Sequence, residues 1–103
     1  MSEIRLPSIS GTESLLLDLL EHRERFGLEL VDASGGKVKR GSVYVTLARM
    51  ESKGFVESRQ EDRPRGAIGL PRRLYRATSY GLKVRDAYHL LRDALALKPA
   101  EAQ

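Results

Sequence analysis

Several residue types that carry reactive or ligand-binding chemistry are missing or scarce in this sequence of 103 residues. It contains no cysteine, which excludes disulfides, zinc–thiolate sites and cysteine nucleophiles. It also contains no tryptophan, and aromatic residues make up only 6% of the chain, so few rings are available to hold a planar ligand. No apolar run approaches the length of a membrane span, and residues 1–10 lack the pattern of a signal peptide. We therefore expect a cytoplasmic protein that makes no membrane contact.

The histidines do not form a catalytic or metal-binding arrangement in the sequence. His22 lies in a charged segment and His89 in a helical one, and neither has a carboxylate or nucleophile at a characteristic spacing. Neither shares a metal-ligand spacing with other donors. The closely spaced glycines also lack the strand–loop–helix context of a phosphate-binding loop. We expect a protein that is not an enzyme and that binds no metal or cofactor.

The chain is basic, and its positive charges are grouped rather than spread evenly. Its formal net charge is +4 and its pI is near 9.7, which favours an anionic partner. Lys37, Lys39 and Arg40 form one group, and residues 59–76 hold six arginines against two acidic residues. A solvated basic surface without a partner is the simpler alternative. The groups lie on either side of one predicted helix, and this favours nucleic acid as the partner.

The N-terminal part of the chain predicts a flexible arm followed by a capped helix. Residues 1–9 are expected to form the arm, because Pro7 opposes early helix formation. Ser10 and Glu13 have the S-x-x-E spacing of a capping box, which marks the start of a helix. The leucines that follow form an apolar stripe at helical spacing, so this first helix has one face for the core.

Two further helices are predicted at short intervals. A second helix is expected at 28–33, where Leu30 and Val31 would be buried. A third is expected at 41–53, after a turn that contains glycines and basic residues. Three helices joined by such turns are typical of a helix-turn-helix core.

The predicted third helix has two faces with different chemistry. Val43, Leu47 and Met50 recur at i, i+4 and i+7 and therefore fall on one face. The other side is polar and partly basic, which suits a helix that reads the major groove of DNA. A helix that serves only the core would show the same periodicity, so this alternative stays open. The residues away from the apolar face are Ser42, Val45, Arg49, Ser52 and Lys53.

A β-hairpin is predicted directly after the third helix. Its strands are expected at 55–60 and 72–77, and the segment between them contains two prolines and two glycines, which makes it a loop. A hairpin with a long basic tip behind a reading helix is the arrangement of a winged helix. Ile68 and Leu70 in this loop have three interpretations: packing on the body, contact with a partner subunit, or insertion beside bases.

A fourth helix is predicted at 78–97, with more apolar surface than one small core can cover. Its apolar positions step by 4, 3, 4 and 3 residues, which is a heptad-like seam. We expect a second copy of the chain to cover this seam, and a helix folded back on its own domain is the alternative. Residues 98–103 are expected to form a disordered tail. The residues expected at the subunit interface are Leu15, Leu19, Tyr80, Val84, Ala87, Tyr88, Leu91, Ala94 and Leu95.

The order and spacing of several fragments together resemble one protein family. These fragments are Phe26-Gly-Leu-Glu-Leu30, Gly41-Ser-Val-Tyr44, Met50-Glu51, Gly54-Phe-Val-Glu57 and Arg72-Arg-Leu-Tyr-Arg-Ala-Thr78. They resemble the PadR family of bacterial transcriptional regulators, in a short form with a single C-terminal dimerisation helix. The resemblance implies a mainly α fold with a small β-hairpin (α+β). In this fold a winged helix-turn-helix would occupy 10–77 and the dimerisation helix 78–97.

The resemblance also implies a function: a homodimeric, sequence-specific DNA-binding regulator, and by default a repressor, that reads a pseudo-palindromic operator. Ser42 and Tyr44 would approach the DNA backbone, and Val45 stands where the family often has a proline. A small aromatic effector held between subunits would have Tyr80 and Tyr88 as its available aromatic contacts. The residues expected to contact double-stranded DNA are Lys37, Lys39, Arg40, Ser42, Tyr44, Val45, Thr46, Arg49, Lys53, Arg63, Arg65, Arg72 and Arg73.

The winged-helix fold alone does not decide whether the partner is DNA, RNA or another protein. Winged helices also act as protein–protein interaction adaptors without sequence-specific DNA binding, and some bind RNA. The distribution of charge favours DNA over a protein partner. An adaptor would not need lysines and arginines concentrated before the third helix and along the hairpin.

Overall fold

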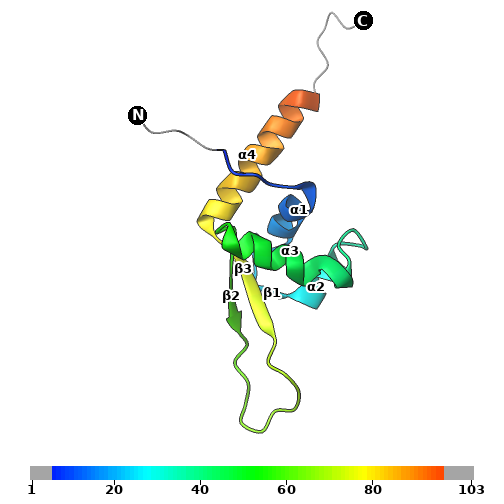
Figure 1. Ribbon diagram of the computed structural model, residues 1–103, viewed down its shortest axis with the longest axis vertical. Helices are drawn as coiled ribbons and strands as arrows, with labels where there is room; N and C mark the ends of the chain where they lie inside the picture. Colours follow the sequence, from blue (N-terminus) through cyan, green and yellow to red (C-terminus); the bar gives the residue numbers. More distant parts are fainter. Residues whose placement is uncertain (1–5, 97–103) are drawn as a thin grey trace, which may run out of the picture.

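The computed structural model describes residues 6–96, which form four helices and a small antiparallel sheet (Figure 1). The sheet contains β1 (Arg25–Phe26), β2 (Val56–Gln60) and β3 (Arg73–Ala77) in the spatial order β1-β3-β2. This arrangement confirms the predicted winged helix-turn-helix fold, and the bounds predicted for the second to fourth helices and for the two hairpin strands are met to within one residue. The elements are α1 (Gly11–Leu19), β1 (Arg25–Phe26), α2 (Gly27–Ala33), α3 (Arg40–Ser52), β2 (Val56–Gln60), β3 (Arg73–Ala77) and α4 (Ser79–Ala96).

Helix α1 begins with the predicted capping box. The backbone N–H of Glu13 donates to Ser10 Oγ at 3.1 Å, and the backbone N–H of Ser10 donates to Glu13 Oε1 at 2.9 Å. Glu13 is only 1% exposed, and its carboxylate also accepts hydrogen bonds from Lys53 Nζ at 2.9 and 3.0 Å. The same carboxylate therefore caps α1 and ties it to the residue that ends α3.

This ion pair corrects the expected role of Lys53. The sequence places Lys53 on the DNA-facing side of the third helix, but its ammonium group binds Glu13 and donates to the carbonyl of Ser8 at 2.9 Å. Ser8 is therefore held by α3, and Ile9 packs against the core, so the expected flexible arm does not extend through residue 9. The remaining arm residues 1–5, Leu97 and the tail at 98–103 lie outside the described residues.

The core lies between the helices and one face of the sheet. Val43, Leu47 and Met50 of α3 are fully buried, which confirms the predicted apolar face of this helix. Leu30 of α2 is buried as expected, but Val31 is only half-buried because it borders an open hollow at the edge of the core. The other buried apolar residues are Leu16, Leu17, Leu20, Val38, Phe55, Val56, Tyr75 and Val84.

The sheet contains a strand that the sequence does not predict. The Phe26-Gly27 step reads as a break in the sequence, but Arg25 and Phe26 pair antiparallel with Tyr75 and Leu74 of β3. A strand of two residues is too short to show the alternation by which strands are predicted. Its effect is to place β3 in the centre of the sheet, next to the start of α2.

The hairpin formed by β2 and β3 leads directly into α4. Thr78 caps α4, since its Oγ1 accepts from the backbone N–H of Gly81 at 2.9 Å and donates to the carbonyl of Gly54 at 2.6 Å. A Cβ added to Gly81 would lie 2.2 Å from the carbonyl oxygen of Phe55. Only glycine therefore lets the first turn of α4 lie this close to the turn between α3 and β2. Beyond this contact, α4 rises past α1 and its last turns extend above the body (Figure 1).

We predict that Gly81→Ala destabilises the fold, because its methyl group would overlap a backbone atom that cannot rotate away. The loss should be about 1–3 kcal/mol in the free energy of unfolding, measured by urea denaturation. Gly41→Ala is the matched control, since no atom lies within 4 Å of a Cβ added there. Alanine in that helical position should be neutral or stabilising, by up to about 1 kcal/mol. Equal stability of the two variants would show that the close contact between Gly81 and Phe55 does not limit the position of α4.

Candidate functional site

The outward side of α3 carries an exposed polar and basic surface. Ser42, Val45 and Arg49 are exposed, Val45 by 62%, and Thr46 is half-buried. Arg49 makes no hydrogen bond or ion pair with any residue in the range 6–96. The same holds for the side chains of the three basic residues that lead into the helix and are also exposed: Lys37, Lys39 and Arg40. These basic residues, expected from the sequence to bind DNA, thus lie at the surface. None of them has an acidic partner among residues 6–96.

Tyr44 is both packed and accessible. Its ring lies against the backbone of Gly27, where an added Cβ would come within 2.5 Å of the ring. The residue is nevertheless 49% exposed. The contact with Gly27 at the start of α2 therefore holds the Tyr44 ring in place. The exposed part of the ring stays available to a binding partner.

A groove separates α3 from the base of the hairpin. It has a volume of about 350 Å³ and runs beside Tyr44, the start of α2 and the first residues of β3. The residues that line it are Phe26, Gly27, Leu28, Glu29, Tyr44, Leu70, Pro71, Arg72, Arg73 and Tyr75. Tyr44, the one α3 residue in this lining, thus faces the base of the hairpin across a shallow groove.

We use the name wing for β2, β3 and the loop between them, and two of its arginines hold the wing itself. Arg72 donates two hydrogen bonds of 3.1 Å to the carboxylate of Glu61, and its guanidinium lies 3.9 Å from the ring centroid of Phe26. The paired charge lowers the pKa of Glu61. The pair therefore stabilises the wing base at neutral pH and loses this effect as pH falls through the lowered pKa. Arg63 donates to the carbonyls of Ile68 and Gly69 across the loop.

The other two wing arginines of the expected set are more available. Arg73 lies on the α3 side of the sheet and donates to Ser58 Oγ at 3.1 Å, and this hydroxyl in turn donates to Glu51 of α3. Arg65 stands on the loop without a hydrogen bond or ion pair to any residue in 6–96. The structure therefore divides the expected wing arginines into two that maintain its shape and two whose charge faces outward.

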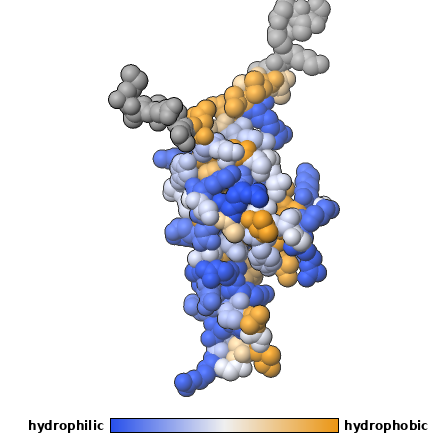
Figure 2. All heavy atoms as spheres, viewed as in Figure 1, coloured by the Kyte–Doolittle hydropathy of each residue, from blue (hydrophilic) through white to orange (hydrophobic). Residues whose placement is uncertain are grey.

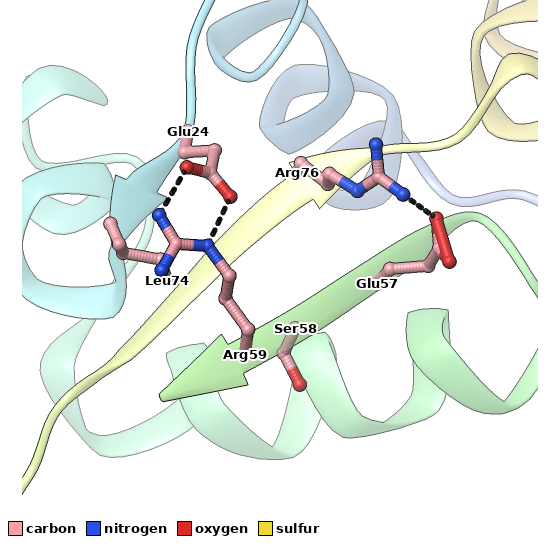
Figure 3. A pocket seen from close by; sticks show the side chains of 6 residues that line it. All are labelled: Glu24, Glu57, Ser58, Arg59, Leu74 and Arg76. Carbon is pink, nitrogen blue, oxygen red and sulfur yellow. Dashed lines mark hydrogen bonds and ion pairs between the residues drawn. The ribbon is translucent and has the colours of Figure 1, made fainter. Parts of the chain in front are cut away.

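The opposite face of the sheet carries arginines that glutamates neutralise (Figure 3). Arg59 forms a two-bond pair with Glu24 at 2.9 and 3.1 Å, and Arg76 bonds Glu57 at 2.7 Å. The Arg59 guanidinium lowers the pKa of the Glu24 carboxyl. These pairs line a hollow of about 540 Å³ together with Leu74 and Ser58. Among the described residues, Arg73 on the α3 side and Arg65 on the loop are therefore the wing arginines that have no acidic partner.

Helix α4 exposes an apolar stripe that its own domain does not cover. Leu90, Leu91 and Leu95 are 73%, 60% and 76% exposed, and Tyr80 is 48% exposed. Figure 2 shows this apolar surface on the upper turns of α4. Ala87 and Ala94 are exposed on the same helix, and Leu15, Leu19 and Tyr88 are half-buried.

Two residues of α4 differ from the roles the sequence suggests. Val84, expected at the subunit interface, is 8% exposed because it packs into the core of its own domain. The role of Arg85 is missed in the sequence: this residue is 7% exposed and bonds Asp18 and Glu21 of α1 at 2.9 and 2.8 Å. These carboxylates raise the pKa of Arg85 further. Its position on the same side of the helix as core residues is the sequence signal that would have predicted a buried, paired arginine.

No candidate metal site or membrane-spanning helix accompanies these surfaces in the described part of the chain. Among residues 6–96, no group of histidine, aspartate and glutamate side chains is arranged to hold a metal ion. In the same range, no helix combines the length and the apolar character needed to cross a membrane.

We predict that Arg72→Lys loosens the base of the wing. Lysine keeps the charge but cannot form the two parallel bonds to Glu61 or stack flat on Phe26. Hydrogen exchange at the Glu61 amide, which donates to the Arg72 carbonyl at 2.8 Å, should accelerate by about tenfold. Arg59→Lys is the matched control, because it alters an equivalent two-bond pair that joins β2 to Glu24 instead of closing the base of the loop. Equal exchange rates at Glu61 in both variants would contradict this role for Arg72.

Several solved structures share this fold. A PadR family transcription regulator from Clostridium difficile R20291 superposes with a TM-score of 0.70, at 22% identity over 84% of this chain and 91% of that one. A PadR family transcriptional regulator from Eggerthella lenta DSM 2243 gives 0.64, at 27% identity over 81% and 76%. A PadR-like transcription factor from Bacteroides fragilis gives 0.69, at 17% identity over 81% of each chain. A comparison with curated proteins gives no match.

The sequence itself matches a family model. Residues 16–87, well over half of the chain, match the model of the transcriptional regulator PadR-like family. This range contains α3, the wing and the start of α4. The family consists of transcription regulators rather than enzymes. The uncompensated basic surface of α3 and the wing thus belongs to a winged helix-turn-helix protein, and the chain is a member of the PadR-like family of transcriptional regulators.

Proposed function

We propose that the protein is a homodimeric, sequence-specific repressor that reads a pseudo-palindromic DNA operator in the cytoplasm. The observation that carries this proposal is the contrast between paired arginines on one face of the wing and unpaired basic residues on α3, before α3 and on the wing loop. Arginines on the face away from α3 are paired with glutamates, whereas Arg49, Arg65 and the cluster before α3 have no acidic partner among the described residues. Phosphates would supply the missing negative charge.

Helix α3 would enter the major groove. Its buried side fixes the helix on the core, and its exposed side presents Arg49, Val45 and Thr46 to base edges. Arginine pairs well with guanine, and an apolar side chain such as valine can contact the methyl group of thymine. Ser42 and Tyr44 near the start of the helix would bind the backbone, with the Tyr44 ring held by its packing on Gly27.

The wing would bind the DNA backbone beside α3. Arg73 lies on the α3 side of the sheet, and Arg65 lies on the loop. Arg63 and Arg72 support these contacts indirectly by maintaining the shape of the loop and the wing base. The sequence predicts DNA contacts for all four arginines, and the proposed arrangement assigns direct contacts to Arg65 and Arg73 alone.

A second copy of the chain would cover the exposed stripe of α4. Burying Leu90, Leu91 and Leu95 together removes a contiguous apolar surface from water, which is the usual reason for such a helix to pair. A two-fold axis through this contact would present two copies of α3 to half-sites about one helical turn apart. Occupation of a promoter by such a dimer would block transcription by steric occlusion.

Selection of bound duplexes from a random pool at physiological salt tests the reading function directly. We expect enrichment of a sequence with two-fold symmetry, because two equivalent copies of α3 would read it. Arg49→Ala should change the preferred base at a symmetric pair of positions. A pool that remains unenriched would contradict sequence-specific binding and favour a protein–protein adaptor.

Salt dependence tests the backbone contacts on the same duplex. Arg73→Ala should reduce the slope of log K against log salt by about 1 per subunit, since one phosphate contact is lost. Arg76→Ala is the matched control, because Arg76 lies on the same strand but on the opposite face, paired with Glu57. Equal slopes for the two variants would remove the α3 side of the wing from the DNA contact.

We predict that Leu91→Lys converts the dimer into a monomer, measured by light scattering. A charged group in the middle of the stripe would have to be buried without a partner. Ala96→Lys is the matched control, since this residue is exposed and lies at least about 100° around the helix from each of the three leucines. It should leave the molecular mass unchanged. A dimer that persists in Leu91→Lys would place the subunit contact elsewhere.

A further inference from the structure

The tip of the wing carries two of the most exposed apolar side chains of the described chain. Ile68 is 94% exposed and Leu70 is 88% exposed, on either side of Gly69. Neither packs on the body, which removes one of the three interpretations left open by the sequence. Figure 2 shows this apolar surface at the end of the wing, separate from that on α4. A loop that only binds phosphates has no need of such residues.

The loop that carries this pair is closed by internal bonds. The backbone N–H of Ala67 donates to the carbonyl of Pro64 at 3.1 Å, and Gly66 between them has a φ of +85°, as a type II turn requires. Arg63 donates to the carbonyls of Ile68 and Gly69, and Gly69 itself has a φ of +93°. These bonds fix the backbone around the apolar pair before any partner arrives.

The surroundings of the pair fit DNA. Arg65 stands at the corner of the turn at 64–67 with its charge uncompensated within 6–96. Leu70 also borders the groove that Tyr44 and Arg73 line, so the tip is continuous with the surface proposed to bind DNA. A second copy of the chain has its own apolar surface to cover on α4, which rises at the opposite end of the molecule (Figure 1).

We propose that Ile68 and Leu70 enter the minor groove next to the half-site read by α3 and partly unstack a base step. Arg65 would bind the adjacent backbone. This inference rests on the proposed DNA-binding function and adds a second mode of recognition to it. Apolar wedges of this kind open the minor groove and bend the duplex toward the major groove by roughly 20–90°. Steps that unstack easily would be preferred, so the tip would select sequence through deformability.

Removal of the wedge tests this inference on the duplex enriched by selection. The double variant Ile68→Ser/Leu70→Ser should bind about tenfold or more weakly, since two apolar side chains no longer leave water. It should also abolish the bend, measured by energy transfer between dyes at the two ends of the duplex. Its melting temperature should equal that of the parent protein, because both side chains are exposed. Leu6→Ser is the matched control, since Leu6 is 87% exposed and lies far from the wing in sequence.

Arg65→Ala separates the apolar wedge from the electrostatic contact. It should reduce the salt slope by about 1 per subunit and leave the bend in place. The wedge variant should do the reverse, keeping the slope and losing the bend. A wedge variant that only reduces the slope would overturn the proposal.

Modified bases identify the groove that is read. Diaminopurine in place of adenine adds an amino group to the minor groove and leaves the major-groove edge of the base pair unchanged. At the positions beside the α3 half-site it should weaken the parent protein and leave the wedge variant unaffected. Replacing A·T by inosine·cytosine pairs there keeps the minor-groove pattern and should be tolerated. If diaminopurine were tolerated and inosine·cytosine pairs weakened binding, the assignment to the minor groove would be overturned.

The outcomes distinguish this inference from the proposed function. If the parent protein enriches no duplex, the proposed function fails and the wedge fails with it. If the parent protein binds a selected duplex but the wedge variant binds and bends it equally, only the wedge is overturned. A fall in molecular mass of the wedge variant, by light scattering, would instead show that the pair contacts a second copy of the chain.

Discussion

The buried carboxylate of Glu13 fixes the relation between the first helix and the third. An unpaired carboxylate at 1% exposure would destabilise the fold by roughly several kcal/mol. Its oxygens accept from the backbone of Ser10 and from the ammonium group of Lys53, so the charge is met from two elements at once. The start of α1 and the end of α3 must therefore lie next to one another whenever the chain is folded. This contact therefore helps to fix the direction in which the exposed side of α3 faces.

The sequence predicts well those elements whose signal is local. The spacing of Val43, Leu47 and Met50 identifies the buried side of α3, and the S-x-x-E spacing identifies the cap of α1. The strands of the hairpin are found because proline and glycine mark the loop between them. The two-residue strand β1 is missed, since it exists only through its pairing with β3. Local patterns carry no information about such a partner.

The roles of individual charges are harder to predict, because they depend on residues distant in the sequence. Lys53 and Arg72 read as basic surface, yet one binds Glu13 from forty positions away and the other binds Glu61 across the hairpin. Arg85 shares a face of α4 with core residues and bonds two carboxylates of α1. Composition predicts that the wing is basic, but strand pairing decides which of its arginines have glutamate partners.

The close contact between Gly81 and Phe55 has a consequence for control of the protein. Because the first turn of α4 lies directly against the turn that follows α3, a shift of α4 toward that turn would also displace the end of α3. In a dimer built on α4, a change in the crossing angle of the paired helices would alter the separation and tilt of both copies of α3. Under the proposed function, a ligand or partner bound at the far end of α4 would then change DNA affinity without touching the DNA-facing surface.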